Sequence, residues 1–326
     1  MKQTKILSLA FLGIMALASC GSSKEDFPVP GSGGSSTDAT NTNANKASAS
    51  LPSVVAKNIT RLEFPKTSSN GHSYVVVHKA DGDFNFASEW DTDLNAQRWT
   101  CYNYNKTNKA DSNVGRSGDF RDDPDLKEQY SIQQFTLDES PYKNSGFDRG
   151  HLLGSDERQK SLVANQQTFY FTNMHPQYAN FNQKGLWTSM ETEVKRLGRA
   201  VIDKDTLFVV KGGTIDNSNI LMWIKNNQQS STKEDGYIPV AKYFFVALLK
   251  KQWNSTTNAF DYHAFGYWFE HTNNVTTSEK LSNYIVNIDE LESKTGIDFF
   301  CNLPDETEKK VQSASVENIK SFWGYK

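Results

Sequence analysis

The stretch NSGFDRGHLLGSDERQ, residues 144–159, contains the residues best suited to chemistry. His151 lies there in a polar segment punctuated by glycines, where a side chain can meet solvent and substrate. A histidine in this position can take a proton from water near neutral pH, which is the main demand of hydrolysis. Asp148 would hold the imidazole tautomer or organise the turn, and Gly150 would permit a bend that aims His151 outward. Taken alone, an Asp-x-x-His pattern is more often a surface or capping arrangement.

The next stretch, TNMHPQYANFNQKGLW, residues 172–187, supplies neutral oxygen donors of the kind that hold a hard cation. Because Mg²⁺ keeps several of its waters, one asparagine and one more distant carboxylate suffice to bind it. Asn182 opens a predicted helix, and Glu191 lies on that helix about two and a half turns later. His175, before Pro176, is predicted to pack or to shape a turn, because no second histidine or cysteine stands at zinc-ligand spacing.

Strands and helices must position these side chains. Runs rich in Val, Phe and Tyr and bounded by Gly, Asn, Asp or Pro predict strands. The runs are residues 73–79, 168–174, 206–213, 243–250 and 262–270. Helices are predicted over residues 186–197, with Gly198 as the stop, and over residues 287–296, which end at Gly296. Strands and helices without regular βαβ alternation predict an α+β domain around an antiparallel or mixed sheet.

The net charge of the 326-residue chain is −3 and its pI is about 6.1. This balance excludes the global basic field that usually marks a dedicated nucleic-acid binder. A polyanion would have to be held by a metal or by a local patch, for which Arg149, Lys184, Lys195 and Arg196 are candidates. For Lys195 and Arg196, a solvated helix face is the simpler interpretation.

Residues 1–19 have the pattern of a secretory signal, with two lysines, a short apolar segment and small residues. The ending LASC resembles the lipobox of bacterial lipoproteins, in which cleavage precedes the cysteine and Cys20 is acylated. A plain cleaved signal with an incidental cysteine is the alternative. Residues 20–50 are predicted to be a flexible Ser/Gly/Asn-rich tether, and residues 51–326 one domain. The sequence thus predicts an exported protein that a lipid anchors to the cell envelope at the outer membrane, facing the periplasm or the cell surface.

Two further cysteines, Cys101 and Cys301, follow the tether. An oxidising compartment permits a disulfide between them, whereas the apolar run DFFCNLP around Cys301 is equally compatible with a buried free thiol. A long separation along the chain says nothing about proximity, so both alternatives stay open.

The sequence around His151 resembles the DNA/RNA non-specific endonucleases, an endonuclease G-like family of ββα-metal (His-Me finger) nucleases. The family has an Asp-Arg-Gly-His motif, here residues 148–151, and an aromatic strand ending in Asn-x-x-Pro-Gln, here residues 173–177. It then has a helix with Asn, Gln, Trp and Glu, here Asn182, Gln183, Trp187 and Glu191. VGRSGDFRDDPDL, residues 114–126, is similar to the arginine segment upstream, and the resemblance covers most of residues 73–305.

The resemblance implies a ββα-metal fold, with helices flanking a central sheet, and cleavage of DNA or RNA without sequence preference. It implies that Mg²⁺, or Mn²⁺ as a substitute, polarises the scissile phosphate and stabilises the leaving 3′ oxygen. His151 would act as general base on water. Asn182 would bind the metal directly, and Glu191 would hold metal-bound waters.

The other site residues follow from the same resemblance. Either Arg116 or Arg121 would stabilise the charge of the transition state. Asn173 and Asp148 would support the geometry around the histidine, and Arg149 would add a positive charge to the site.

One spacing departs from the family pattern. From Asn182 to Trp187 the chain takes five residues, one more than the family uses. Gln183 and Asn180 are therefore alternative metal ligands.

Two other classes of function remain to be compared with this one. A catalytically inactive surface lipoprotein of the same fold would bind nucleic acid or a protein partner, but the presence of all the catalytic and metal-site residue types argues against such decay. An envelope lipoprotein that merely displays loops leaves the joint occurrence of three ordered motifs unexplained. The residues do not distinguish DNA from RNA as substrate, and a homodimer, which the resemblance allows, stays open.

Overall fold

The computed structural model describes residues 40–109, 114–274 and 280–326. The predicted signal peptide and Cys20 lie outside the described residues. Within the described part, strands and helices follow one another without regular alternation, which confirms the α+β class. The strands are β1 (Ser73–Ala80), β2 (Asp83–Asp91), β3 (Ala96–Tyr104), β4 (Asp148–His151), β5 (Met174–Gln177), β6 (Thr206–Gly213), β7 (Ile220–Lys225), β8 (Gln228–Ser230), β9 (Ile238–Ala241), β10 (Tyr243–Asn254), β11 (Ala259–Glu270) and β12 (Ile285–Val286).

The α-helices are short apart from α5, which is the one that backs the candidate site. They are α1 (Ser53–Ala56), α2 (Pro124–Tyr130), α3 (Leu162–Gln167), α4 (Ala179–Lys184), α5 (Leu186–Arg199), α6 (Ile288–Thr295), α7 (Asp305–Gln312) and α8 (Val316–Trp323). The 3-10 helices are η1 (Ser155–Glu157), η2 (Phe171–Asn173), η3 (Asn217–Asn219) and η4 (Leu281–Tyr284).

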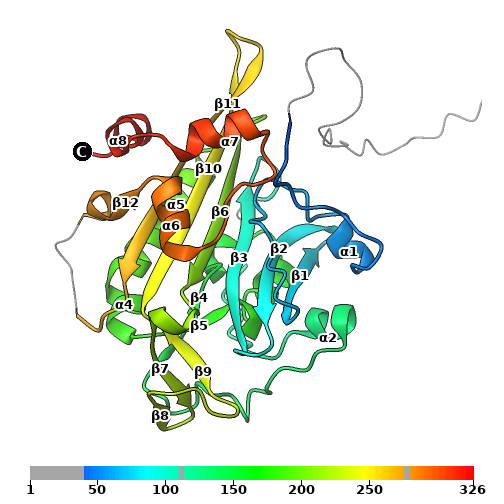
Figure 1. The fold of residues 1–326 in the computed structure, drawn as a ribbon, viewed down its shortest axis with the longest axis vertical. Coiled ribbons are helices and arrows are strands. Elements are labelled where there is room, and N and C mark those ends of the chain that lie inside the picture. The colour runs from blue at the N-terminus through cyan, green and yellow to red at the C-terminus, as the bar shows by residue number, and fades with distance from the viewer. Residues whose placement is uncertain (1–39, 110–113, 275–279) are drawn as a thin grey trace, which may run out of the picture. The chain divides into compact units, whose positions relative to one another are not determined.

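A large antiparallel sheet forms the centre of the fold (Figure 1). In the described residues it has seven strands in the order β1-β2-β3-β6-β10-β11-β12. The strands β10 and β11 pair over twelve residues each and form its longest hairpin. Two small sheets, β4-β5 and β8-β7-β9, lie outside it. The predicted antiparallel or mixed sheet is therefore confirmed as antiparallel.

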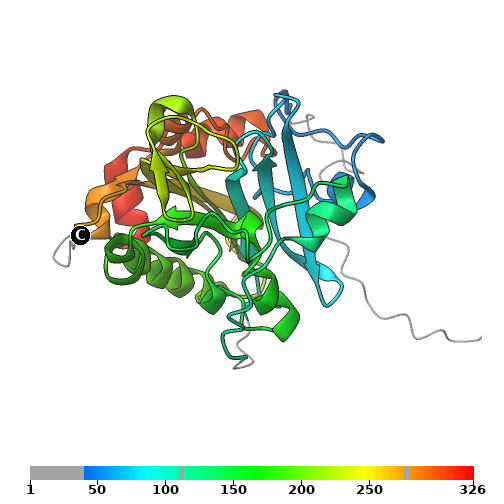
Figure 2. The same ribbon diagram turned by 90° about the horizontal axis from the view of Figure 1, so that it is seen from below.

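Both faces of the central sheet are buried, as strand β10 illustrates. Successive side chains of a strand point to opposite faces. Phe244 and Val246 accordingly pack in a core that includes residues of α5 and α8, whereas Phe245 and Ala247 pack in a second core with residues of α1, α6 and α7. Figure 2 shows the sheet between the green segment that carries β4, β5, α4 and α5 and the orange helix α6 on the other side.

Four of the five predicted strands are confirmed as β1, β6, β10 and β11, but the strand predicted over residues 168–174 is wrong. This run forms the 3-10 helix η2, and a strand begins only at Met174. The side chain of Asn173 donates a hydrogen bond to the carbonyl oxygen of Thr168 at 2.8 Å and so closes the run into a loop. A short apolar run does not by itself distinguish a strand from a buried loop.

The helix predicted over residues 287–296 is confirmed as α6. Asn287 caps it by accepting a hydrogen bond from the backbone N–H of Glu290, and Gly296 ends it with φ of +66°. The stop predicted at Gly198 is wrong, because α5 continues to Arg199. A Cβ on Gly198 would lie 2.4 Å from the ring of Tyr104, so this glycine permits close packing of α5 against β3.

The folded part begins before residue 51, where the sequence predicted the end of the tether. Asn45 is only 4% exposed. Its backbone N–H donates to Asn302 Oδ1 at 2.9 Å, and its side chain donates to the carbonyl oxygen of Pro65 at 2.9 Å. The segment is fixed by hydrogen bonds of asparagine side chains, so its lack of apolar residues concealed that it is ordered.

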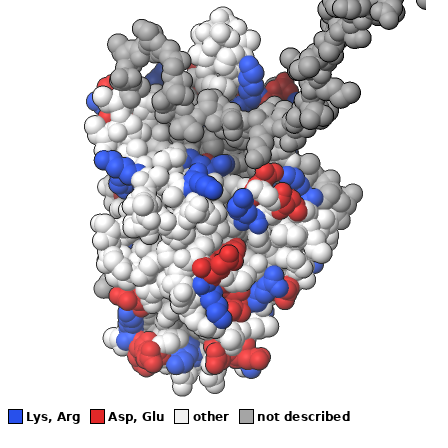
Figure 3. Space-filling model, turned by 90° about the vertical axis from the view of Figure 1, so that its right-hand side faces the viewer, with Lys and Arg blue, Asp and Glu red and all other residues white. Residues whose placement is uncertain are grey.

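Cys101 and Cys301 are buried free thiols, so the structure favours the second of the two alternatives for these cysteines. Among the described helices, none is both long and apolar enough to span a membrane. On the side of the molecule that lies at the right of Figure 1, positive and negative side chains are interspersed (Figure 3). No extended field of one sign covers that face, in agreement with the small net charge.

Candidate active site

A two-stranded sheet and a helix carry the residues of the Asp-Arg-Gly-His motif. Strand β4 contains the whole motif and pairs antiparallel with β5, so that His151 lies opposite Met174. The indole Nε1 of Trp187, on α5, donates to the carbonyl oxygen of His151 at 3.0 Å. Gln97 of β3 donates to the carbonyl oxygen of Met174 at 2.7 Å. These bonds fix the ends of β4 and β5 between the central sheet and α5.

Gly150 is needed for close packing and not for a bend. It lies within β4 and is not among the residues with positive φ. A Cβ there would lie 2.2 Å from the side chain of Gln177, which is fully buried. The expectation that Gly150 turns His151 outward is therefore wrong.

The chain forms a cleft of about 960 Å³ along β4 and α5. Six of the predicted site residues line it, namely Arg116, Asp148, Arg149, His151, Asn182 and Glu191. Two others, Asn173 and Arg121, do not line it. The tertiary structure thus brings together residues from three parts of the chain, at residue 116, at residues 148–151 and at residues 182–191.

His151 is buried and not solvent-exposed as the sequence suggested, since only 7% of it is accessible. The rings of Phe169 and Phe120 lie 4.9 and 5.7 Å from its ring. Its Nε2 has no hydrogen-bond partner among the described residues. Burial, with smaller contributions from Arg116 and other cations, lowers the pKa of His151 to about 3. The imidazole is therefore neutral at physiological pH and able to accept a proton.

Asp148 contacts the candidate metal ligand and not the histidine. Residues three apart in a strand point to opposite sides, which keeps Asp148 away from His151. Its Oδ2 accepts hydrogen bonds from Asn182 Nδ2 at 2.9 Å and from Gln183 Nε2 at 2.7 Å. Because the amide nitrogen of Asn182 is held in this way, its Oδ1 remains available as a ligand.

Asn182 does not open the helix that carries Glu191, contrary to the expectation. It lies near the end of α4, and the chain breaks at Gly185 before α5 begins. A Cβ on Gly185 would lie 2.7 Å from the backbone oxygen of Asn180, so the break requires a glycine.

Of the alternative metal ligands, Gln183 lines the cleft and Asn180 does not. The side chain of Asn180 donates instead to the carbonyl oxygen of Asn273 at 2.8 Å.

Glu191 lies half-buried on α5 and lines the same cleft. Burial raises the pKa of its carboxyl to about 7, although Lys211 opposes the shift. Neither this carboxyl nor Asn182 Oδ1 forms a hydrogen bond with the described residues. One amide oxygen and one carboxylate, with room for waters, fit a Mg²⁺ ion, which takes few protein ligands.

Asn173 supports the chain that follows His151. It is fully buried, and its Oδ1 accepts from the backbone N–H of Leu153 at 2.9 Å. Its Nδ2 donates to the carbonyl oxygens of Leu153 at 2.9 Å and Thr168 at 2.8 Å. Within the described part of the chain, the side chain of Asn173 thus supports the site through its bonds to backbone atoms.

The structure distinguishes the two candidate arginines. The guanidinium of Arg116 is exposed, lines the cleft and lies 4.8 Å from the ring centroid of Phe169. The guanidinium of Arg121 is paired with Asp119 at 2.9 Å and lies over the ring of Tyr170. Arg116 is therefore the arginine that can meet a substrate in the cleft.

Of the other cations predicted to bind a polyanion, two are paired with carboxylates. Lys195 is paired with Asp156 at 3.1 Å, and Arg196 with Glu193 at 2.6 Å. Lys184 is exposed but does not line the cleft. Arg149 lines the cleft, and its guanidinium donates no hydrogen bond to the described residues.

A buried ion pair at the wall of the cleft was missed in the sequence. Lys211 Nζ lies 2.9 Å from Glu157 Oε2, and both side chains are at most 1% exposed. Glu157 also accepts hydrogen bonds from the hydroxyl of Tyr102 and, at 2.9 Å, from the backbone N–H of Gly154. The available signal was a lysine within the apolar run TLFVVKGG, since a charge at such a position is rarely buried without a partner.

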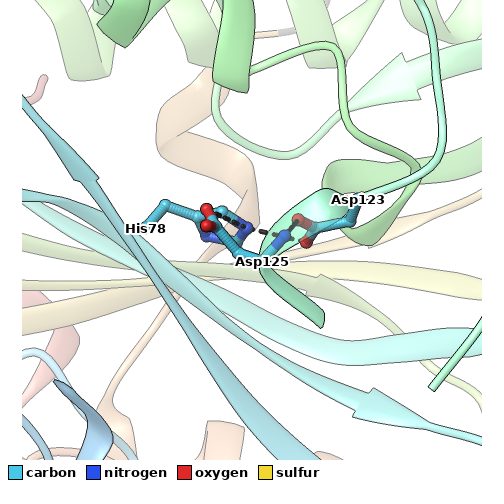
Figure 4. Close-up of side chains that lie close together, drawn as sticks. All are labelled: His78, Asp123 and Asp125. Carbon is cyan, nitrogen blue, oxygen red and sulfur yellow. Dashed lines mark hydrogen bonds and ion pairs between the residues drawn. The ribbon is translucent and has the colours of Figure 1, made fainter. Parts of the chain in front are cut away.

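A second group of titratable residues, also missed, lies outside the cleft (Figure 4). His78, Asp123 and Asp125 form the group of described residues whose ligand atoms come close enough to hold a metal ion. His78 Nε2 donates to Asp123 Oδ2 at 2.7 Å, and Thr172 donates to the same oxygen at 2.6 Å. Asp123 Oδ1 accepts from the backbone N–H of Asp125 at 2.9 Å. Both oxygens of Asp123 are thus occupied by hydrogen bonds.

The charge state of His78 agrees with an ion pair. Burial alone would lower the pKa of His78, but Asp123 and Asp125 outweigh it and raise this pKa above its ordinary value. The group is therefore a buried histidine–aspartate pair that fixes β1 against the start of α2.

The fold and the cleft together define a protein of the ββα-metal nuclease fold, with a strand pair, a helix, a histidine at the strand end and oxygen donors that line the same cleft. The family model for DNA/RNA non-specific endonucleases matches residues 67–306, and the chain belongs to this family. Membership of the family supports endonuclease activity on nucleic acid.

Curated relatives agree with this assignment. A nuclease of Nostoc sp. is 25% identical over 241 residues, 72% of this chain and 77% of the relative. Nuclease C1 of Cunninghamella echinulata is 24% identical over 209 residues, 63% and 75% of the two chains. Mitochondrial endonuclease G of Caenorhabditis elegans is 38% identical over 71 residues, which span only 22% of this chain and 23% of the relative.

Among solved structures, a chain of the EndoG/EndoGI complex superimposes with a TM-score of 0.56 at 20% identity. The match covers 78% of this chain and 94% of that chain. At this level of identity the likeness shows the fold.

Proposed function

We propose that the protein is a metal-dependent, sequence-non-specific endonuclease that hydrolyses phosphodiester bonds of DNA, RNA or both. The observation that carries the proposal is the Nε2 atom of His151, which is neutral and without a partner among the described residues. It lies in the cleft that also contains Asn182, Glu191 and Arg116. Membership of a metal-dependent nuclease family supports the same reaction.

His151 is the general base. Its Nε2 takes a proton from a water molecule, and that water attacks the phosphorus of the scissile bond. The backbone bond from Trp187 and the rings of Phe120 and Phe169 hold the imidazole in place for this step. Because the low pKa keeps the imidazole neutral, the base is ready over the whole physiological pH range.

Asn182 and Glu191 are the residues that would hold Mg²⁺, with Mn²⁺ as a substitute. A bound divalent ion polarises the phosphate and stabilises charge on the leaving oxygen. Asp148 orients the amide of Asn182 so that its oxygen is presented to the cleft. Glu191 would bind the waters of the ion.

Arg116 and Arg149 bind and stabilise the phosphate. Both line the cleft, and neither guanidinium has a carboxylate partner among the described residues. A planar guanidinium presents paired donors that match phosphate oxygens. Contacts of this kind go to the backbone of the nucleic acid, which carries no sequence information, and cleavage is therefore expected to ignore sequence.

The test is plasmid nicking and RNA degradation by the purified full-length chain, with the wild type compared with His151→Ala, in Mg²⁺ and then in EDTA. We expect cutting that requires Mg²⁺ and is lost in the variant, while circular dichroism shows that the variant is folded. A folded wild-type protein that cuts neither substrate in Mg²⁺ or Mn²⁺ would contradict the proposal. It would favour the alternative, an inactive protein of the same fold that binds nucleic acid or a protein partner.

We also propose that the mature chain is exported and anchored to the cell envelope by a lipid on Cys20, as the LASC pattern indicates. Metabolic labelling with a radioactive fatty acid should label the wild type and not Cys20→Ser. A wild-type chain that stays unlabelled would contradict the anchor. Light scattering of the purified chain decides between a monomer and the homodimer that the family resemblance allows.

A further inference from the structure

Three aromatic rings meet at the edge of the cleft. The ring centroids of Phe120 and Phe169 lie 5.0 Å apart at 79°, and each also contacts the ring of His151. Phe169 belongs to the core, whereas Phe120 is half-buried and lines the cleft. Phe120 is therefore the member of this trio that a substrate in the cleft would meet.

The free face of Phe120 carries an arginine. Arg149 Cζ lies 4.0 Å from the ring centroid of Phe120, within the distance at which a guanidinium and a ring attract each other. The guanidinium forms no hydrogen bond with the described residues. Among the described residues, the ring contact is therefore the close interaction that fixes this group, and the carboxylate of Asp148 attracts it from farther away.

Backbone hydrogen bonds of the neighbouring residue Arg121 fix the segment that carries Phe120. The N–H of Arg121 donates to the carbonyl oxygen of Phe169 at 3.3 Å, and the carbonyl oxygen of Arg121 accepts from the N–H of Phe171 at 3.0 Å. The segment of residues 114–123 is thereby joined to the loop that precedes β5. The position of the Phe120 ring is set from outside β4, the strand that carries Arg149.

We propose that Phe120 is a positioning residue that holds the Arg149 guanidinium flat at the cleft wall and so presents its N–H edge to a substrate phosphate. The inference rests on the proposed function and extends it. A carboxylate partner would fix an arginine equally well, but it would occupy the donors and cancel the charge. A ring occupies one face of the guanidinium and leaves all its N–H groups free. Preorganisation of this kind removes the loss of side-chain entropy that binding would otherwise require.

The experiment is a double-mutant cycle on the full-length chain with Phe120→Leu, Arg149→Lys and the combination. Phe120→Leu keeps an apolar side chain but removes the ring face. We expect kcat/KM in Mg²⁺ to fall about tenfold to a hundredfold, as is usual when a phosphate-binding group loses its geometry. Phe120→Tyr, which keeps the ring, should restore most of the activity. The loss in the double variant should be smaller than the product of the two single losses, because both changes remove the contact between Phe120 and Arg149. The part of the Phe120→Leu loss that remains in the double variant belongs to the contact of the ring with His151.

The matched control is Phe84→Leu. The guanidinium of Arg61 lies 4.3 Å from the centroid of this half-buried ring, and neither residue lines the cleft. Phe84→Leu removes the same kind of contact between a ring and a guanidinium, and it should leave kcat/KM unchanged. An equal loss in Phe84→Leu would show a general effect on the fold and would overturn the proposal.

Binding in EDTA separates this inference from the proposed function. The dissociation constant of a fluorescent DNA duplex is measured for the same variants without metal, where no cutting occurs. We expect Phe120→Leu and Arg149→Lys to weaken binding and to be non-additive, even if the wild type proves inactive as a nuclease. If the two effects multiply, or if Phe120→Leu retains full affinity and activity, Phe120 does not act through Arg149.

Discussion

Two consecutive aromatic residues, Phe169 and Tyr170, each pack against a buried histidine, and the two histidines differ in the charge around them. Phe169 contacts His151, whose neighbours Arg116, Arg149 and Lys211 are positive. Tyr170 contacts His78.

The neighbours of His78 are the carboxylates of Asp123 and Asp125. The pKa falls to about 3 for His151 and rises above the ordinary value for His78. Burial is common to both, so the sign of the neighbouring charge decides which histidine is a neutral base and which is half of an ion pair.

Each histidine also has an arginine beyond its aromatic neighbour. Arg116 lies over Phe169 and is free of carboxylates among the described residues, whereas Arg121 lies over Tyr170 and is paired with Asp119. The first region exposes unpaired groups in a cleft, and the second satisfies all the polar atoms of its central carboxylate. Buried atoms without a hydrogen-bond partner among the described residues occur in both regions, at His151 Nε2 and at His78 Nδ1, so the feature of the first region that indicates function is its position in a cleft.

The largest effect is expected for His151→Asn. Removing the general base should lower kcat/KM by about 10²- to 10⁴-fold, while the free energy of unfolding changes by no more than about 1 kcal/mol. Initial rates of DNA cleavage and urea unfolding measure the two quantities. A variant that still cuts at the wild-type rate would remove His151 from the mechanism and erase the distinction between the two histidines.

The same substitution in the second region, His78→Asn, should have the opposite pattern. Asp123 would lose its buried partner, and we expect the free energy of unfolding to fall by about 3 kcal/mol. The rate of cleavage per folded molecule should change little, as measured below the unfolding temperature of the variant. Should the variant be as stable as the wild type, the pair contributes nothing to the fold.

The two arginines extend the comparison with a smaller effect. Arg116→Gln removes a free positive charge from the cleft and should lower kcat/KM by about a hundredfold. Arg121→Gln, which removes a paired charge outside the cleft, should change it by less than about threefold, as for an ordinary exposed ion pair. Steady-state cleavage of the same duplex compares them, and equal losses would mean that both arginines reach the substrate.

The smallest effect is expected for the pH dependence of stability, which should have opposite signs for His78 and His151. Since the folded-state pKa of His78 is raised, its contribution is fully present below about pH 6.5 and is lost as the pH rises through the folded-state pKa. His151 has a lowered pKa, so between about pH 6.5 and pH 3 the unfolded chain binds more protons and stability falls as the pH falls.

Urea unfolding at pH 5.5 and pH 8 measures both contributions. Relative to the wild type, His78→Asn should be most destabilised at pH 5.5. The free energy of unfolding of the wild type should fall by roughly 1 kcal/mol more than that of His151→Asn when the pH is lowered from 8 to 5.5. Equal pH dependence in the two variants would contradict the assigned charge states.

Much of the fold could be predicted because its long strands and the capped helix α6 have strong local patterns. The runs at 206–213 and 243–250 are apolar and β-branched or aromatic, and they are β6 and β10 in the structure. The run at 168–174 has a similar composition but is folded into a loop by the side chain of Asn173. Gly198 resembles a helix stop, yet it is retained because Tyr104 packs against it.

The residues of the candidate site could be predicted from the sequence, but their contacts could not. Residue types and spacing indicated His151, Asn182 and Glu191, the family resemblance added the upstream arginine segment, and six of the predicted site residues line one cleft. The partner of Asp148 was not predictable, because whether it meets His151 or Asn182 depends on which side of β4 each side chain lies. The choice between Arg116 and Arg121 depends likewise on the path of one loop.

The sequence by itself determined the family and the chemical groups, since these depend on residue types in a fixed order along the chain. Tertiary structure decided which of these groups are paired. His78 and Asp123 are 45 residues apart, and Glu157 and Lys211 are 54 residues apart. Burial, and the distances between such residues, are properties of the packed chain, and they alone set the charge of a buried histidine.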